Sequence, residues 1–227
     1  MAETVQLAAA DGFLCPAYVA RPEGPPRGAV VVLQEIFGVN AHIRAVTDGY
    51  AVQGYLALAP ATFQRVKLNV ELGYTPADME TGRALKAAVE ALAAPGVMAD
   101  IQAAIDYAAQ AGKVALVGYC WGGLLAWRSA CGLNGLSAVA PYYGGGMTAA
   151  GDASRQPKCP VLCHFGDQDH WISLDSVETF RQAQPRVEVQ VYPTDHGFNC
   201  DHRASYDAAA ATLARERTLA FFARHLA

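Results

Sequence analysis

Two kinds of hydrophobic pattern alternate along the chain. Some runs are continuously apolar, such as 28–34 (GAVVVLQ), which is typical of a strand buried on both faces of a sheet. Others repeat their apolar positions with helical spacing, as in the alanine-rich segments 80–94 and 97–111. We expect strands at 5–9, 13–20, 28–34, 55–60, 113–118, 136–144, 160–166 and 187–193, the first two as a hairpin. We expect helices at 40–53, 80–94, 97–111, 121–131, 173–184 and 203–226.

This alternation of strands and helices predicts an α/β fold. Such an order favours a mostly parallel sheet with helices on both faces. The spacers are short, so we expect one domain over residues 1–227. Only 61–78 lacks a clear pattern, and it could border a site or be a plain surface loop.

Composition and charge exclude several classes of protein. The chain is 52% hydrophobic and 17% charged, which indicates a globular core rather than disorder. A net charge of −4 without a basic cluster gives no reason to expect nucleic-acid binding. We find no signal peptide and no apolar run of about 20 residues, so we expect no membrane span and a cytoplasmic location.

The six cysteines are scattered and carry no clear disulfide or zinc pattern. Cys159 and Cys163 are four residues apart, but they fall in or beside an expected strand. A zinc site would need further closely spaced ligands. We therefore expect five of the six to be buried free thiols: Cys15, Cys131, Cys159, Cys163 and Cys200.

The sixth, Cys120, occupies a special position in VALVGYCWGGLLAWR. An apolar strand leads into a turn in which Gly118 and Gly122 flank Cys120, and a helix follows. This matches the G-x-nucleophile-x-G elbow, whose strained backbone needs small neighbours. A helix N-terminus favours a thiolate and a developing oxyanion. The alternative is a structural cysteine buried in a tight turn.

Two later segments offer partners for Cys120. Asp169 follows an expected strand in GDQDHWI, and His196 follows the last strand in TDHGFN. Cys120, Asp169 and His196 thus run in the nucleophile–acid–base order of α/β-hydrolases. His196 would move the proton while Asp169 orients the ring. Asp167 is a rival for the acid, and Asp195 is less suited because it adjoins His196.

The remaining histidines have simpler interpretations. His164 lies in an apolar strand and is expected to be a core residue, while His170 could line the site. His42, His202 and His225 are expected at the surface or at helix ends. No metal-binding motif is present, so we expect neither a metal nor another cofactor.

Several motifs together resemble the dienelactone hydrolase (carboxymethylenebutenolidase-like) family. They are QEIFGVN, VGYCWGG, HFGDQDHWI, HGF and ERTLAFF, and the resemblance extends from about Phe13 to the C-terminus. It implies an α/β-hydrolase fold without a large cap domain. It also implies a catalytic triad of Cys120, His196 and Asp169.

The resemblance further assigns roles to the segment after the first long parallel strand. Glu35 would contact the thiol, move when substrate binds and help to generate the thiolate. A solvated loop charge is the generic interpretation of Glu35, but its apolar surroundings in VVVLQEIFG favour burial. The backbone N–H groups of Ile36 and Trp121 would form the oxyanion hole. The elbow geometry alone also implies the N–H of Trp121.

The sequence departs from the family at the expected substrate anchor. Well-known members hold the substrate carboxylate with two arginines, and Cys200 stands where one of them would be. A thiol does not replace a bidentate arginine. Arg83 lies near the second position without secure register, and Arg203 could substitute or be a helix-surface cation. We expect Tyr74, Arg83, Phe198 and Arg203 as substrate-binding residues.

The expected function is cofactor-independent hydrolysis of a small carboxylic ester or lactone. A narrower alternative is a true carboxymethylenebutenolidase that opens dienelactone to maleylacetate, and a broader one is a small ester or thioester substrate. An alternative of another class is a non-catalytic, redox-sensing thiol protein built around Cys120. We expect a small-molecule partner and a monomer or small homo-oligomer.

Overall fold

One eight-stranded sheet organises the part of the chain that the computed structural model describes, residues 2–227. Its strand order is β1-β2-β4-β3-β5-β6-β7-β8. The strands are β1 (Ala2–Ala8), β2 (Leu14–Ala20), β3 (Ala29–Leu33), β4 (Leu56–Pro60), β5 (Val114–Tyr119), β6 (Leu136–Tyr142), β7 (Leu162–Gly166) and β8 (Glu188–Tyr192).

The sheet is mostly parallel, as predicted. β1 and β2 form the expected antiparallel hairpin, β2 pairs antiparallel with β4, and the remaining neighbours pair in parallel. Every residue of β3 and β5 is buried, which explains their continuous apolar runs. These central strands therefore form a rigid support for the loops at their carboxyl ends.

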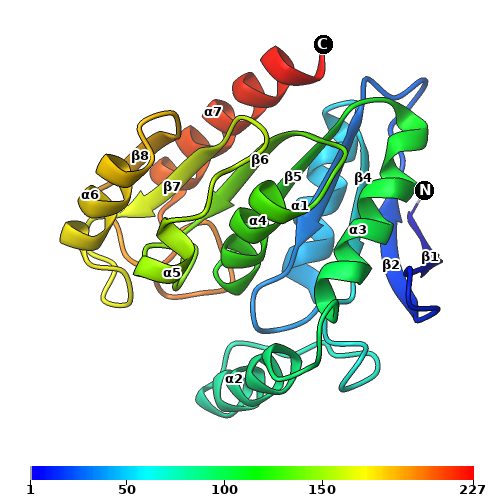
Figure 1. The fold of residues 1–227 in the computed structure, drawn as a ribbon, viewed down its shortest axis with the longest axis horizontal. Coiled ribbons are helices and arrows are strands. Elements are labelled where there is room, and N and C mark those ends of the chain that lie inside the picture. The colour runs from blue at the N-terminus through cyan, green and yellow to red at the C-terminus, as the bar shows by residue number, and fades with distance from the viewer. Residues whose placement is uncertain (1) are drawn as a thin grey trace.

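Helices cover both faces of this sheet (Figure 1). They are α1 (Ala41–Val52), α2 (Pro76–Glu90), α3 (Val97–Ala108), α4 (Trp121–Gly132), α5 (Ala150–Ala153), α6 (Leu174–Ala183) and α7 (Ala208–Leu226). Helices α3, α4 and α6 lie on one face, where Trp127 of α4 packs against Phe180 of α6. Helices α1 and α7 share the other face, where Tyr50 packs against Phe222.

Two helices begin four or more residues away from the predicted start. Helix α2 begins at Pro76 rather than at 80, because Thr75 and Asp78 form a capping box and Pro76 occupies the first turn. Helix α7 begins at Ala208 rather than at 203, because Asp207 accepts a hydrogen bond from the Ala210 N–H as N-cap. Residues 203–207 are consequently a loop. Helix α2 also ends at Glu90 rather than at 94, α3 ends at Ala108 rather than at 111, and the short α5 lies where no helix is predicted.

The predicted absence of a large cap domain is confirmed within residues 2–227. Only α2 and the segment before it extend beyond the layers of the sheet and its covering helices (Figure 1). No helix in this described range combines the length and apolar character that crossing a bilayer requires.

All six cysteines are free thiols. Cys15, Cys163 and Cys200 are buried as expected, whereas Cys131 and Cys159 are only half-buried. The expectation of five buried thiols therefore holds for three of them.

Candidate active site

Cys120 lies in a strained turn between β5 and α4. Its φ of 55° and ψ of −114° place a non-glycine residue in a rarely populated conformation. The flanking glycines are required by space, since a Cβ on Gly118 would lie 2.0 Å from the Gly122 carbonyl oxygen. A Cβ on Gly122 would lie 2.4 Å from the carbonyl oxygen of Gln34. The elbow therefore packs directly against the loop after β3.

The elbow leaves a backbone donor beside the thiol. Trp121 is the first residue of α4, so its N–H has no carbonyl partner within the helix. The indole ring is fixed separately, because it stacks on Phe63 at a centroid distance of 5.1 Å and donates to Glu90 over 3.1 Å. This N–H is consequently available to an oxyanion formed at Cys120.

The structure brings together the predicted base and acid. His196 Nδ1 lies 2.8 Å from Asp169 Oδ2, and both side chains are buried. The other oxygen of Asp169 accepts hydrogen bonds from the N–H groups of Trp171 (2.8 Å) and Ile172 (3.1 Å). These bonds fix the carboxylate, so the ring of His196 is held with Nε2 free for chemistry.

The rival acids are placed elsewhere. Asp167 is exposed. Asp195 accepts from the backbone N–H of His196 and contacts the ring of His170 at 2.9 Å, rather than the ring of His196. Of the three aspartates considered from sequence, only Asp169 bonds to the imidazole of His196.

The surroundings of His196 favour its protonated form. Burial by itself lowers the pKa of a histidine, but negative charge on Cys120 and the hydrogen bond to Asp169 outweigh it. Together these effects raise the pKa of His196 to about 10. The arrangement therefore favours an imidazolium beside Cys120.

Glu35 is buried, so the interpretation as a solvated loop charge is wrong. It follows β3, and its Oε1 accepts a hydrogen bond from Arg203 Nη1 at 3.4 Å. Its Oε2 has no hydrogen-bond partner in the described part of the chain. The carboxylate is thus paired with Arg203 rather than with Cys120.

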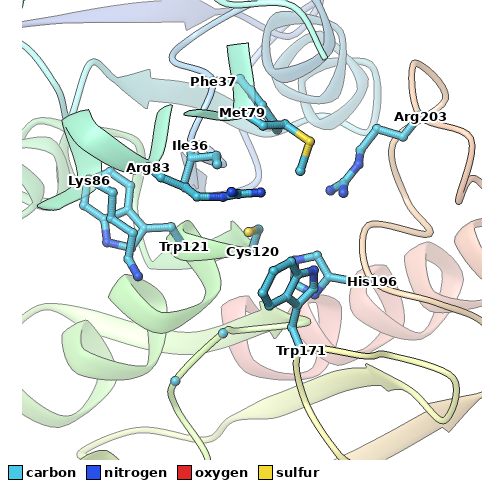
Figure 2. A pocket seen from close by; sticks show the side chains of 12 residues that line it. Ile36, Phe37, Met79, Arg83, Lys86, Cys120, Trp121, Trp171, His196 and Arg203 are labelled. Carbon is cyan, nitrogen blue, oxygen red and sulfur yellow. The ribbon is translucent and has the colours of Figure 1, made fainter. Parts of the chain in front are cut away.

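Cys120 and His196 share a cavity of about 340 Å³ (Figure 2). Figure 2 shows the guanidinium groups of Arg83 and Arg203 pointing from opposite sides into the space around Cys120. Arg83 also lies over the exposed ring of Trp171, 5.8 Å from its centroid. The cavity lining comprises Ile36, Phe37, Met79, Arg83, Lys86, Cys120, Trp121, Gly145, Gly146, Trp171, His196 and Arg203.

The four expected substrate-binding residues are distributed differently. Arg83 and Arg203 line the cavity around Cys120, and Arg203 is a loop residue, not a helix-surface cation. Tyr74 lines an adjoining cavity of about 420 Å³ that also reaches His196 and His170. Phe198 needs correction, because it is fully buried between aromatic rings and does not line either cavity.

His164 lies where the sequence predicts it, whereas His42 is buried at a helix end. His164 is the predicted core residue, with hydrogen bonds to Tyr192 (2.8 Å) and Thr218 (2.9 Å), and burial lowers its pKa to about 3. His42 was expected at the surface or a helix end. It lies in the first turn of α1, but its side chain is buried because the loop after β8 covers it through Asp201.

Sequence reasoning missed six residues of the cavity lining: Phe37, Met79, Lys86, Gly145, Gly146 and Trp171. Met79 and Lys86 lie on α2 with Arg83, at spacings of four and three residues, which place all three on one helix face. The capping signal at Thr75 and Asp78 could have revealed this helix earlier in the chain. Trp171 lies two residues after Asp169, and no local pattern pointed to it.

The chain is similar to several known proteins over most of its length. The model of the "Dienelactone hydrolase family" matches residues 15–226. The carboxymethylenebutenolidase of Pseudomonas putida is 33% identical over 231 residues, covering 98% of this chain and 97% of that protein. A Synechocystis protein named "Putative carboxymethylenebutenolidase" is 36% identical over 215 residues, covering 87% and 86%. A crystal structure of a "Putative Dienelactone Hydrolase" from Klebsiella pneumoniae has a TM-score of 0.84 and 34% identity, covering 98% of both chains.

Proposed function

Because this chain belongs to the dienelactone hydrolase family and is therefore an ester or lactone hydrolase, we propose that Cys120, His196 and Asp169 hydrolyse a small anionic substrate through an acyl-thioester. The observation that carries this proposal is that His196, held by Asp169 at 2.8 Å, lines the same cavity as Cys120. Arg83, Lys86 and Arg203 line the same cavity and favour a substrate with negative charge.

Acylation starts with attack of the Cys120 sulfur on the substrate carbonyl carbon. The oxygen becomes negatively charged, and the N–H groups of Ile36 and Trp121 are the proposed donors to it. When this intermediate collapses, the bond between the carbonyl carbon and the leaving oxygen breaks. The imidazolium of His196 donates its Nε2 proton to that oxygen. An alcohol then departs from an ester, whereas a lactone keeps its new hydroxyl attached to the acyl group.

Deacylation uses water and the same groups. Neutral His196 takes a proton from water, and the hydroxide attacks the thioester carbonyl. Collapse of the second intermediate releases the carboxylic acid and returns Cys120 to the thiolate. Asp169 keeps the ring oriented in both halves of the reaction. The complete reaction consumes one water for each ester or lactone bond.

Glu35 is proposed to control the thiol through its partner Arg203. In the structure this carboxylate is paired with Arg203, which also lines the cavity. A substrate anion would compete for the guanidinium and loosen its hold on Glu35. Glu35 would then be free to move toward Cys120 and take up the thiol proton.

The narrower candidate is carboxymethylenebutenolidase activity. The relative from Pseudomonas putida carries that name, and the cavity around Cys120 contains two arginines despite Cys200. Arg83 and Arg203 project into it from opposite sides, as a clamp on a substrate carboxylate requires (Figure 2). The same assay can therefore test the mechanism and this substrate.

The decisive experiment compares wild type with Cys120→Ala on a dienelactone and on a neutral aryl ester. We expect the variant to lose at least about 1000-fold of its activity on both substrates, because the nucleophile is removed. Cys131→Ser is the matched control, as it removes a half-buried thiol outside the cavity lining. Full turnover by Cys120→Ala would refute the mechanism.

The choice of substrate separates the two candidates. Lactone opening well above the rate with the neutral ester supports carboxymethylenebutenolidase activity. Cleavage of the neutral ester alone supports the broader esterase. A Cys120 that oxidises readily without turnover of any acyl substrate would favour the redox-sensing alternative.

The remaining features of the proposal concern context. Six free thiols are typical of a reducing compartment, which supports a cytoplasmic location. We also propose that residues 1–227 form one domain, that its partner is a small molecule and neither nucleic acid nor membrane, and that it is a monomer or small homo-oligomer. Light scattering on the purified chain measures the last of these.

A further inference from the structure

A second group of reactive side chains lies behind the proposed catalytic cavity. A carboxylate oxygen of Glu35, a ring nitrogen of His42 and the sulfur of Cys200 all lie within 4.8 Å of one another. Glu35 follows β3, His42 lies in the first turn of α1, and Cys200 belongs to the loop after β8. All three are buried, so three distant segments converge on one interior point.

Two atoms of this group lack hydrogen-bond partners among the described residues. They are Oε2 of Glu35 and Nε2 of His42, each on a side chain that is at least nine-tenths buried. Buried polar atoms are nearly always paired, because an unpaired one loses its interaction with water. A ligand between these atoms and the Cys200 sulfur would satisfy both.

The outer contacts hold the histidine and the glutamate in a suitable state for binding. His42 Nδ1 lies 3.0 Å from Asp201 Oδ1, so Nδ1 carries the proton and Nε2 offers its lone pair to the interior. A carboxylate behind a histidine is the common support of a metal-binding imidazole. Arg203 occupies Oε1 of Glu35 and leaves Oε2 for a ligand.

We propose that Glu35, His42 and Cys200 form a binding site for a divalent cation of the Zn²⁺ class. Thiolate, imidazole and carboxylate are the ligands that this borderline-soft ion accepts, whereas Mg²⁺ and Ca²⁺ require mostly oxygen. Tetrahedral Zn²⁺ places its ligand atoms about 3.3–3.8 Å apart, so small side-chain movements suffice. The Cys200 proton leaves to solvent when the ion binds.

The surroundings supply a route of entry and a fourth ligand. His42 and Asp201 line a cavity of about 250 Å³, and Cys120 is not among its lining residues. A water from this cavity or the Tyr74 hydroxyl would complete the coordination. Tyr74 is held near the site by the Asn40 side chain, which donates to its oxygen over 3.1 Å.

A cation at this site would also affect the proposed hydrolysis. This effect rests on the proposed function, whereas cation binding does not. Glu35 adjoins Ile36, whose N–H is a proposed oxyanion donor, and Glu35 is the proposed partner of the thiol. A bound cation would hold its carboxylate on the His42 side of the loop. Occupation of the site should therefore inhibit hydrolysis without touching Cys120.

Binding is tested in a Cys120→Ala background, which removes the catalytic thiol as a competing ligand. We expect one Zn²⁺ per chain by calorimetric titration, and a thiolate charge-transfer absorption when Co²⁺ is added. Adding Cys200→Ser should abolish that absorption and weaken Zn²⁺ binding at least about tenfold. Adding Cys131→Ser instead is the matched control and should leave both unchanged.

A milder variant keeps the proposal testable if the Cys200→Ser protein fails to fold. Asp201 is exposed, so Asp201→Asn should fold, and loss of its support should weaken Zn²⁺ binding about tenfold. Absence of Zn²⁺ binding overturns the proposal. Binding by the Cys200→Ser and Asp201→Asn proteins that is as tight as in the Cys120→Ala background also overturns it, since the ion would then lie elsewhere.

Inhibition is measured separately on the enzyme with Cys120 intact. Zn²⁺ should lower the rate of ester cleavage, and Asp201→Asn should shift the inhibiting concentration upward by the same factor as the binding constant. Binding without inhibition would leave the site standing and refute the role given to Glu35. Failure of all ester cleavage would refute the proposed function and leave the binding result unaffected.

Discussion

At the scale of single residues, the chemistry of His196 depends on its contacts with Asp169 and Cys120. Its ring bonds to the Asp169 carboxylate and interacts with Cys120, and these contacts raise its pKa against the effect of burial. A general acid must hold its proton until the leaving oxygen needs it. The contacts of this one ring therefore decide the order of proton transfers in the proposed reaction.

The first prediction concerns the pKa of His196. Cys120→Ala removes the negative charge, and Asp169→Asn removes the hydrogen-bonded carboxylate, while burial persists in both. Each variant should therefore lower the pKa of His196 from about 10 toward or below its ordinary value. Nuclear magnetic resonance of the labelled imidazole measures the titration, and His225 in the last turn of α7 is an internal control.

The raised pKa of His196 makes the free energy of unfolding depend on pH. The folded pKa of His196 is raised, so its protonation stabilises the fold below about pH 6.5. This contribution is lost as the pH rises through about 10. The free energy of unfolding of wild type should thus fall more steeply over this range than that of Cys120→Ala. An unchanged titration in both variants would contradict the assigned contacts.

At the scale of elements, α2 shapes the site from outside the sheet. It presents Met79, Arg83 and Lys86 to the cavity, and it approaches the turn after β3 at Gly82. A Cβ on Gly82 would lie 2.3 Å from the carbonyl oxygen of Ile36. The close approach fixes the backbone of a proposed oxyanion donor and the direction of the Arg83 side chain together.

The second prediction is that Gly82→Ala damages turnover. The new methyl group must push α2 away from the Ile36 turn, which misplaces the donor and the arginine. We expect kcat to fall at least about tenfold, since loss of one oxyanion-hole donor costs about 100-fold or more. Gly132→Ala is the control, because a Cβ there meets nothing within 4 Å. An unchanged kcat in Gly82→Ala would show that the packing of α2 against the Ile36 turn does not contribute to catalysis.

The predictability of elements depended on how local their signals were. The elbow at Cys120 and the buried strands before it are specified by adjacent residues, so the sequence located them closely. The start of α2 is also encoded locally, in Thr75, Pro76 and Asp78. The prediction relied on the spacing of apolar residues, which contains no information about polar capping residues. Helix α7 was extended too far because Asp207 was not identified as its N-cap.

Contacts between distant segments could not be predicted in the same way. Arg203 meets Glu35 across 168 positions, and His42 meets Asp201 across 159. Neither pair has a spacing that a motif search could detect, because only the fold brings the segments together. The metal-ligand criterion likewise required closely spaced residues and so passed over the cluster of Glu35, His42 and Cys200.

At the scale of the whole molecule, the charge of the site opposes the charge of the chain. The net charge is −4, yet three cationic side chains line the cavity at Cys120. Helix α2 and the loop after β8 direct these cations into the cavity. An anionic substrate therefore meets overall repulsion at long range and attraction at the cavity.

The last prediction uses salt to distinguish these two ranges. The Debye length falls from about 10 Å at 0.1 M to about 3 Å at 1 M salt, so attraction at the cavity mouth should be screened. We expect KM for an anionic ester to rise several-fold between these concentrations, and KM for a matched neutral ester to change little.

Arg83→Gln should raise KM for the anion at low salt and flatten its salt dependence. Arg181→Gln is the control, since Arg181 is an exposed cation of α6 that pairs with Glu178. Equal salt dependence for both esters would show that the three cations do not select charge, and the substrate would then be chosen by the apolar wall of Ile36, Phe37 and Trp171.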